Sequence, residues 1–174
     1  SGKLLHVNKK EYWDEWGVDI NNYGPLAFNG IEPVGHPSVP EPYRSIGPID
    51  GSFAPLSDVP TFHDSISKGN KTGWLYTRNK TDFLEYTDEN NRDLMPDEMH
   101  AQWAAKRIKE METNDSDQPF FMGIGFVRPH TPLYAPKRFF DMFPIEKIEL
   151  SEIKEGDADD THYKDISPAK NKGP

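Results

Sequence analysis

The stretch that decides the fold is PFFMGIGFVRPHTP, residues 119–132. Residues 120–127 are almost all apolar and have the length of a strand; we call them the apolar run. They predict a strand buried on both faces of a parallel or mixed sheet. His130 follows directly, and the carboxyl ends of strands are where open α/β sheets place their ligands. The stretch therefore predicts an α/β protein with a candidate site at His130.

The sequence upstream of the apolar run predicts a helix from Pro96 to about Met111. Proline and the acidic residues Asp97 and Glu98 suit a first helical turn. The imperfect apolar stripe of this helix consists of Met99, Trp103, Ile108 and Met111, together with Ala101, Ala104 and Ala105. A polar loop is predicted over 113–118. A helix followed by a buried strand is typical of α/β proteins.

The regions on either side are less regular. Residues 7–94 show no sustained period of two or 3.6, and many of the 16 prolines and 13 glycines interrupt every candidate element. A loop region of this length is improbable inside a self-sufficient small domain. We expect one partial domain over 1–174, with a loop-rich pocket region at 7–94. A helix, strand, histidine-loop and second helix are expected over 95–148, and an acidic tail over 149–174.

Composition excludes several function classes. The 174 residues carry a formal net charge of -9, which disfavours a general nucleic-acid binder because phosphate contacts need clustered Lys and Arg. No cysteine is present, so a disulfide scaffold, a thiolate zinc site and a cysteine nucleophile are excluded from this chain. No apolar stretch has the length of a membrane span, and the N-terminal residues lack the hydrophobic segment of a signal peptide.

Two segments carry residues suited to chemistry. In SGKLLH, residues 1–6, Lys3 and His6 can both face an anionic oxygen if the segment turns after a strand. His130 can donate a proton to a leaving group near neutral pH. Each segment by itself has an ordinary alternative, namely an exposed lysine with an incidental histidine, or a histidine that stabilises a loop between prolines.

Taken together, the two segments resemble a known family. Residues 2–6, GKLLH, resemble the Gly-Lys-x-x-His element of type I sulfatases, and residues 119–139 resemble the strand and histidine loop of that family. The similarity is greatest to the iduronate-2-sulfatase-like branch. Residues 95–97 and 143–148 follow the order of that branch as well. The resemblance implies an interior fragment of the alkaline-phosphatase-like sulfatase fold.

The resemblance also implies roles for matching residues. In the family, a hydrated formylglycine attacks sulfur while a calcium ion holds the sulfate. Lys3 would touch the sulfate oxygens and the nucleophile, and His6 would contact the formylglycine hydroxyl. His130 would lie beside the bridging oxygen as a candidate general acid. Lys137 is a further candidate for substrate binding, with a solvated helix face as the alternative interpretation.

Other elements of the family pattern are missing. No serine lies in a Ser-x-Pro/Ala-x-Arg context, since Ser38 and Ser167 both fail it, and no Asp-Asp pair stands near the N-terminus. Asp159 and Asp160 lie in the acidic tail. The formylglycine and the calcium ligands of the parent enzyme are therefore expected outside this chain, which binds no cofactor alone and is predicted to be inactive by itself.

The resemblance implies that the parent protein hydrolyses sulfuric esters of a sulfated carbohydrate. Its expected partners are that substrate and the remainder of the sulfatase domain, with no nucleic acid and no membrane. The family implies an exported protein, whether periplasmic, extracellular or lysosomal. The alternative is a non-catalytic module in which tryptophan-rich loops bind a glycan or a protein. A phosphoesterase with Ser or Thr as nucleophile is a third possibility.

Overall fold

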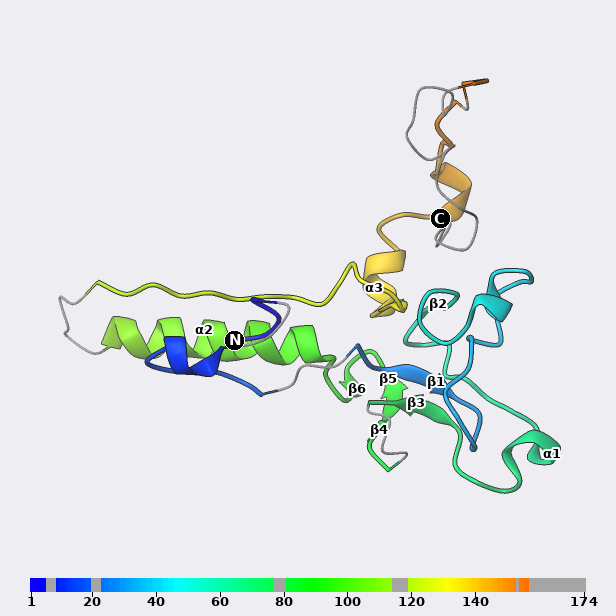
Figure 1. Ribbon diagram of the computed structural model, residues 1–174, viewed down its shortest axis with the longest axis horizontal. Coiled ribbons are helices and arrows are strands. Elements are labelled where there is room, and N and C mark those ends of the chain that lie inside the picture. The colour runs from blue at the N-terminus through cyan, green and yellow to red at the C-terminus, as the bar shows by residue number, and fades with distance from the viewer. Residues whose placement is uncertain (6–8, 20–22, 77–80, 114–118, 153, 157–174) are drawn as a thin grey trace. The chain divides into compact units, whose positions relative to one another are not determined.

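The computed structural model describes residues 1–5, 9–19, 23–76, 81–113, 119–152 and 154–156 (Figure 1). The chain divides into two compact units, Ser1–Met142 and Phe143–Pro174. In the second unit, the described element is the short 3-10 helix η3 (Ile145–Lys147), which follows Pro144. Everything that bears on the candidate site lies in the first unit.

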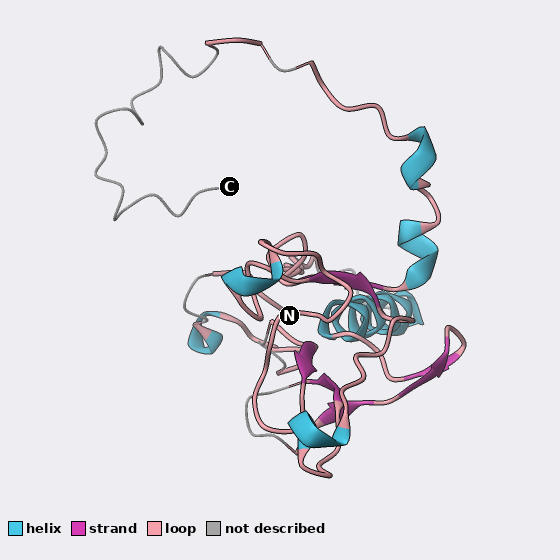
Figure 2. Cartoon of the chain, turned by 90° about the vertical axis from the view of Figure 1, so that its right-hand side faces the viewer, coloured by secondary structure: helices cyan, strands magenta, loops and turns pink. Residues whose placement is uncertain are grey.

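Short strands make up the sheets of the first unit. A three-stranded antiparallel sheet has the order β1-β3-β4, formed by β1 (Leu26–Phe28), β3 (Gly73–Leu75) and β4 (Phe83–Leu84). A parallel pair joins β2 (Phe53–Pro55) to β7 (Leu133–Ala135), with Ala54 opposite Tyr134. An antiparallel pair joins β5 (Tyr86–Asp88) to β6 (Asn91–Arg92). Loops connect most of these elements (Figure 2).

The helices range from one turn to five. The shorter ones are η1 (Lys10–Tyr12), η2 (Arg44–Ile46), α1 (Asp64–Ser67) and α3 (Lys137–Phe140). The long helix α2 (Pro96–Thr113) confirms the helix predicted from Pro96. Its buried residues are Pro96, His100 and Ala104, spaced by four. Ala104 belongs to the predicted stripe, whereas His100 does not, and Ile108 of that stripe is exposed.

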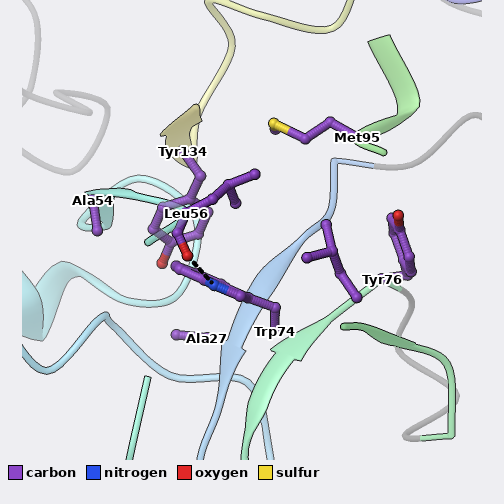
Figure 3. Packing of buried hydrophobic residues seen from close by; sticks show 8 residues of the cluster. Ala27, Ala54, Leu56, Trp74, Tyr76, Met95 and Tyr134 are labelled. Atoms are coloured by element: carbon purple, nitrogen blue, oxygen red, sulfur yellow. Dashed lines mark hydrogen bonds between the residues drawn. The ribbon is translucent and has the colours of Figure 1, made fainter. Parts of the chain in front are cut away.

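The core cluster lies between the small sheets and the start of α2 (Figure 3). Its members are Ala27, Ala54, Leu56, Trp74, Tyr76, Leu84, Met95 and Tyr134. The Trp74 Nε1 donates a hydrogen bond to the Leu56 carbonyl oxygen at 2.9 Å, so the polar edge of the indole is satisfied inside the core. Trp74 is therefore a packing residue of the core.

The prediction of a strand buried on both faces is wrong for the apolar run. Its backbone is extended, but only Gly125 forms a β-bridge, in parallel with Gly2. Phe120, Phe121 and Phe126 are exposed. The physical reason is the lack of neighbours: within the described residues, the run pairs along one edge with the N-terminal segment, and no sheet covers its faces.

The structure bears out the coarser fold expectation, a mixture of helices and strands. Region 7–94 contains η1, η2, α1 and six of the strands, each two to four residues long. A strand of three residues is too short to show a period of two. The prolines and glycines of region 7–94 therefore separate short helices and strands, and the region is not one continuous loop.

Candidate functional site

Backbone pairing brings the two sequence motifs side by side. The Ser1 nitrogen donates to the Gly123 carbonyl oxygen at 3.0 Å, the Gly125 N–H donates to the Ser1 oxygen at 3.0 Å, and the Lys3 N–H donates to the Gly125 oxygen at 3.0 Å. These bonds form a short parallel ladder. The first residues of the chain and the apolar run thereby enter the site in the same direction.

The close approach of these two segments requires glycine. A Cβ built on Gly125 would lie 2.0 Å from the Lys3 carbonyl oxygen, and a Cβ on Gly2 would lie 1.9 Å from the Gly125 oxygen. Gly2 also has a φ of +78°, in the left-handed region that favours glycine. Gly2 is therefore required for the close approach of the two segments, whatever chemistry Lys3 performs.

Tyr23 links Lys3 to His130. The Lys3 Nζ donates a hydrogen bond to the Tyr23 hydroxyl at 2.5 Å and lies 4.7 Å from the centre of the Tyr23 ring. The same ring lies 4.5 Å from the His130 ring, centroid to centroid, at an interplanar angle of 46°. Two candidates that are 127 positions apart thus share one aromatic neighbour. His6 lies outside the described residues.

The histidine loop is tied to the start of α2. The Asp97 carboxylate accepts hydrogen bonds from the backbone N–H groups of Val127 and Arg128, each at 2.9 Å. The His130 N–H then donates to the Val127 oxygen at 2.9 Å, which closes a turn. The predicted helix and the predicted histidine loop are therefore connected through a residue of the first helical turn.

His130 itself is exposed, and its ring is oriented by its own loop. The Nδ1 lies 2.8 Å from the Thr131 carbonyl oxygen, which can only accept, so Nδ1 carries a hydrogen in this arrangement. The Thr131 hydroxyl donates to Asp50 at 2.8 Å and holds the loop from the other side. The described residues provide no hydrogen-bond partner for Nε2. This nitrogen is therefore the one available to a ligand.

Arg128 adds a second cation beneath the site. Its guanidinium donates to three carbonyl oxygens: those of Tyr134 at 3.2 Å, Gly24 at 3.1 Å and Tyr23 at 3.3 Å. Burial lowers the pKa of Arg128, and the nearby Asp97 carboxylate opposes that shift; an arginine nevertheless stays protonated. Within the described part of the chain, neither Arg128 nor Lys3 forms an ion pair with a carboxylate. The site therefore holds two cationic side chains, with the Asp97 carboxylate close to Arg128, and the Lys3 ammonium is the group that suits an anionic ligand.

Lys137 lies on the exposed surface of α3. Its Nζ donates to the Asp141 carboxylate at 2.5 Å, one helical turn further on, and its backbone N–H donates to Glu89 at 2.9 Å. This is the arrangement of a solvated helix face. Its substrate-binding role stays a prediction. A pocket of about 760 Å³ lies elsewhere, among residues 29–66, and none of the candidate residues lines it.

Two histidines outside the site, His36 and His100, are fully buried. His36 Nε2 lies 2.8 Å from the Asp58 oxygen and its ring stacks on Trp74, while His100 Nδ1 lies 2.8 Å from the Ser1 hydroxyl. Burial lowers the pKa of His36. These positions are typical of core histidines with satisfied hydrogen bonds.

Sequence reasoning missed two members of the site. Arg128 was visible beside His130, and its position after the apolar run was the signal that could have identified it. Tyr23 had no such signal, since only the fold brings it to residues 3 and 130.

The described residues contain neither a cluster of metal-ligating side chains nor a membrane-spanning helix. Among them, no group of three or more His, Asp or Glu side chains is arranged to hold a metal ion. None of the helices in the same residues has the length and hydrophobicity needed to cross a bilayer.

Comparison with curated proteins identifies relatives that are sulfatases. A sulfatase of Formosa agariphila is 31% identical over 108 residues, which cover 62% of this chain and 20% of the relative. Human iduronate 2-sulfatase is 27% identical over 154 residues, covering 78% of this chain and 26% of the relative. The mouse iduronate 2-sulfatase is 34% identical over 169 residues, covering 88% and 28%. The chain thus spans 20 to 28% of the length of these relatives. No family model and no solved structure matches it.

Proposed function

We propose that this chain, a segment of the sulfatase family, forms one wall of the sulfate pocket of a sulfuric ester hydrolase. The observation that carries the proposal is the contact of Lys3 and His130 with the same Tyr23 ring. A cation and an imidazole held at one place, with a second cation behind them, suit the binding and protonation of an anionic ester.

Each residue has a distinct part in this proposal. The Lys3 ammonium stabilises negative charge on the sulfate oxygens as the S–O bond to the leaving group breaks. His130 Nε2 protonates the bridging oxygen, because Nδ1 is already engaged with the Thr131 oxygen. His6 takes the role that the family resemblance implies, at the nucleophile. The nucleophile is a formylglycine outside this chain, which supplies the oxygen that attacks sulfur, and calcium outside this chain holds the sulfate.

The wider setting belongs to the proposal as well. The substrate is a sulfated carbohydrate, and the remainder of the sulfatase domain covers the exposed side chains of the apolar run. The full-length protein is exported, as the family resemblance implies. The fold of the whole domain is the alkaline-phosphatase-like one, supported here by the mixed helix and strand architecture and the sulfatase relatives.

The test uses the full-length protein that contains this chain. Lys3→Ala and His130→Ala are expected to lower kcat/KM for a sulfated saccharide by roughly a hundredfold or more. The matched controls are Lys106→Ala and His63→Ala, which change exposed residues of the same types outside the site. The controls are expected to retain wild-type kinetics.

The leaving group provides a sharper readout for His130. An alkyl alcohol must be protonated as it departs, whereas 4-nitrophenolate leaves easily without a proton. His130→Ala should therefore impair an alkyl sulfate much more than 4-nitrophenyl sulfate. Equal losses on both substrates would contradict the general-acid role. A full-length protein without any sulfate-ester turnover, together with glycan binding by the 174-residue chain, would favour the binding module instead.

A further inference from the structure

We propose that Tyr23 contacts the substrate, with its hydroxyl donating a hydrogen bond to a sulfate oxygen between Lys3 and His130. This inference rests on the proposed function. Neither the sequence motifs nor the similarity to sulfatases assigns a role to Tyr23, which enters the site through the fold alone.

The direction of the hydroxyl hydrogen follows from its bond with Lys3. An ammonium group has three donors and no acceptor, so Lys3 Nζ donates and the Tyr23 oxygen accepts, at 2.5 Å. The phenolic hydrogen is left to donate elsewhere. Within the described residues no acceptor engages it, so it is available to a ligand oxygen.

The position of Tyr23 is fixed at three points. Arg128 donates to the Tyr23 carbonyl oxygen at 3.3 Å and to the adjacent Gly24 oxygen at 3.1 Å, which holds the backbone. The ring lies 4.5 Å from the His130 ring, and Lys3 holds the hydroxyl. A donor held in this way loses little conformational freedom when a ligand binds.

The charge at the site selects the kind of ligand. Lys3 and Arg128 are cationic and, among the described residues, form no ion pair with a carboxylate, and the Tyr23 hydroxyl adds a neutral donor next to the first of them. The Lys3 ammonium and the Tyr23 hydroxyl, which lie next to each other, suit an anion with several oxygen acceptors, while the Arg128 guanidinium donates to backbone carbonyl oxygens. A sulfate ester meets this requirement, and free inorganic sulfate presents the same oxygens.

The experiment compares Tyr23→Phe with the wild-type full-length protein. This variant keeps the ring against His130 and removes only the hydroxyl. We expect inorganic sulfate to bind roughly 10- to 100-fold more weakly in calorimetry, the range for one hydrogen bond to a charged group. The kcat/KM for the sulfate ester should fall by a similar factor. Tyr12→Phe, at an exposed tyrosine outside the site, is the matched control.

The outcomes separate this inference from the proposed function. Sulfate-ester turnover in the wild type, with both readouts of Tyr23→Phe within twofold of it, would overturn the role of Tyr23 and leave the sulfatase proposal intact. Weakened sulfate binding in Tyr23→Phe, in a protein without turnover, would support the role in anion binding and overturn the sulfatase proposal. A wild type that neither binds sulfate nor turns over an ester would overturn both.

Discussion

The core cluster and the apolar run are both rich in large apolar residues, yet the core cluster is buried, whereas within the run only Val127 is. Trp74 in the core cluster is 1% exposed, whereas Phe121 in the run is 83% exposed and Phe126 is 52% exposed. The core residues come from several small sheets that pack on one another and on the start of α2. The run pairs with residues 1–3 only, within the described part of the chain. Burial therefore depends on having neighbours and not on local hydrophobicity.

The largest expected effect is that of Trp74→Ala on stability. The Trp74 ring lies 4.6 Å from the Tyr134 ring, and its Nε1 bonds to the Leu56 oxygen. Its removal should lower the free energy of unfolding by about 3–5 kcal/mol, measured by urea denaturation followed by near-UV circular dichroism. The matched variant Phe121→Ala should cost less than about 1 kcal/mol. Similar losses from the two variants would break the comparison, since the run would then be covered in solution.

A smaller effect is expected where the run pairs with the N-terminal segment. In Gly125→Ala the new Cβ would meet the Lys3 backbone at 2.0 Å, so the ladder must shift, at a cost of about 1–3 kcal/mol. Hydrogen exchange at the Lys3 amide should accelerate. In the control Gly123→Ala, the nearest atoms are side-chain carbons of Trp13 and Leu4 at 3.1 and 3.2 Å, which can move. If the two variants are equally destabilised, close backbone approach is not what holds the run.

Alkaline pH should act on the core cluster. Burial raises the pKa of Tyr134 to about 12, from an ordinary value near 10. Because the raised pKa favours the neutral phenol in the folded state, its contribution to stability is complete below pH 10 and is lost as the pH rises through 10 to about 12. Burial also raises the pKa of Tyr76. Unfolding free energies measured between pH 8 and 12 should therefore decline above pH 10.

Tyr134→Phe isolates the contribution of one hydroxyl to that decline. The variant loses the hydrogen bond between Tyr134 and Ser52, worth about 1 kcal/mol at neutral pH. Its stability should then decline less steeply above pH 10 than that of the wild type, because one buried phenol no longer ionises. The exposed Tyr12→Phe serves as control and should keep the wild-type slope. An unchanged slope in Tyr134→Phe would refute the assignment to this group.

The smallest effect is expected at the surface of α3. The Lys137 and Asp141 side chains are about half exposed, and their ion pair joins residues one helical turn apart. Lys137→Ala and Asp141→Ala should each change the free energy of unfolding by less than about 0.5 kcal/mol in urea denaturation. A loss above 1 kcal/mol in either variant would indicate that α3 is bound to the rest of its unit more tightly than this pair shows.

The regions of the molecule differ in how well their structure could be predicted from the sequence. Helix α2 was predictable because Pro96 and the acidic residues after it are local signals for a helix start. The strands of region 7–94 were not, because elements of two or three residues show no periodicity. The apolar run had the hydrophobicity of a buried strand, but hydrophobicity alone does not supply the neighbouring strands that burial requires.

The candidate site was also predictable only in part. The residues Lys3 and His130 were identified from motifs through resemblance to sulfatases, and the structure brings both to one aromatic ring. That ring, Tyr23, was not predictable, since no spacing or motif connects it to either residue. Arg128 lay within the quoted stretch, but only its carbonyl partners on distant segments define what it holds in place.

The sequence by itself thus determined the long helix, the candidate residues of the two motifs and the family to which they point. These features rest on local signals, because helix hydrogen bonds and turn residues join positions a few residues apart. Only the tertiary structure decided which apolar side chains are buried and that Tyr23 lies between Lys3 and His130. These contacts join positions that are 20 residues apart, Lys3 and Tyr23, and 107 residues apart, Tyr23 and His130. They form only when the whole chain closes around them, so no local pattern records them.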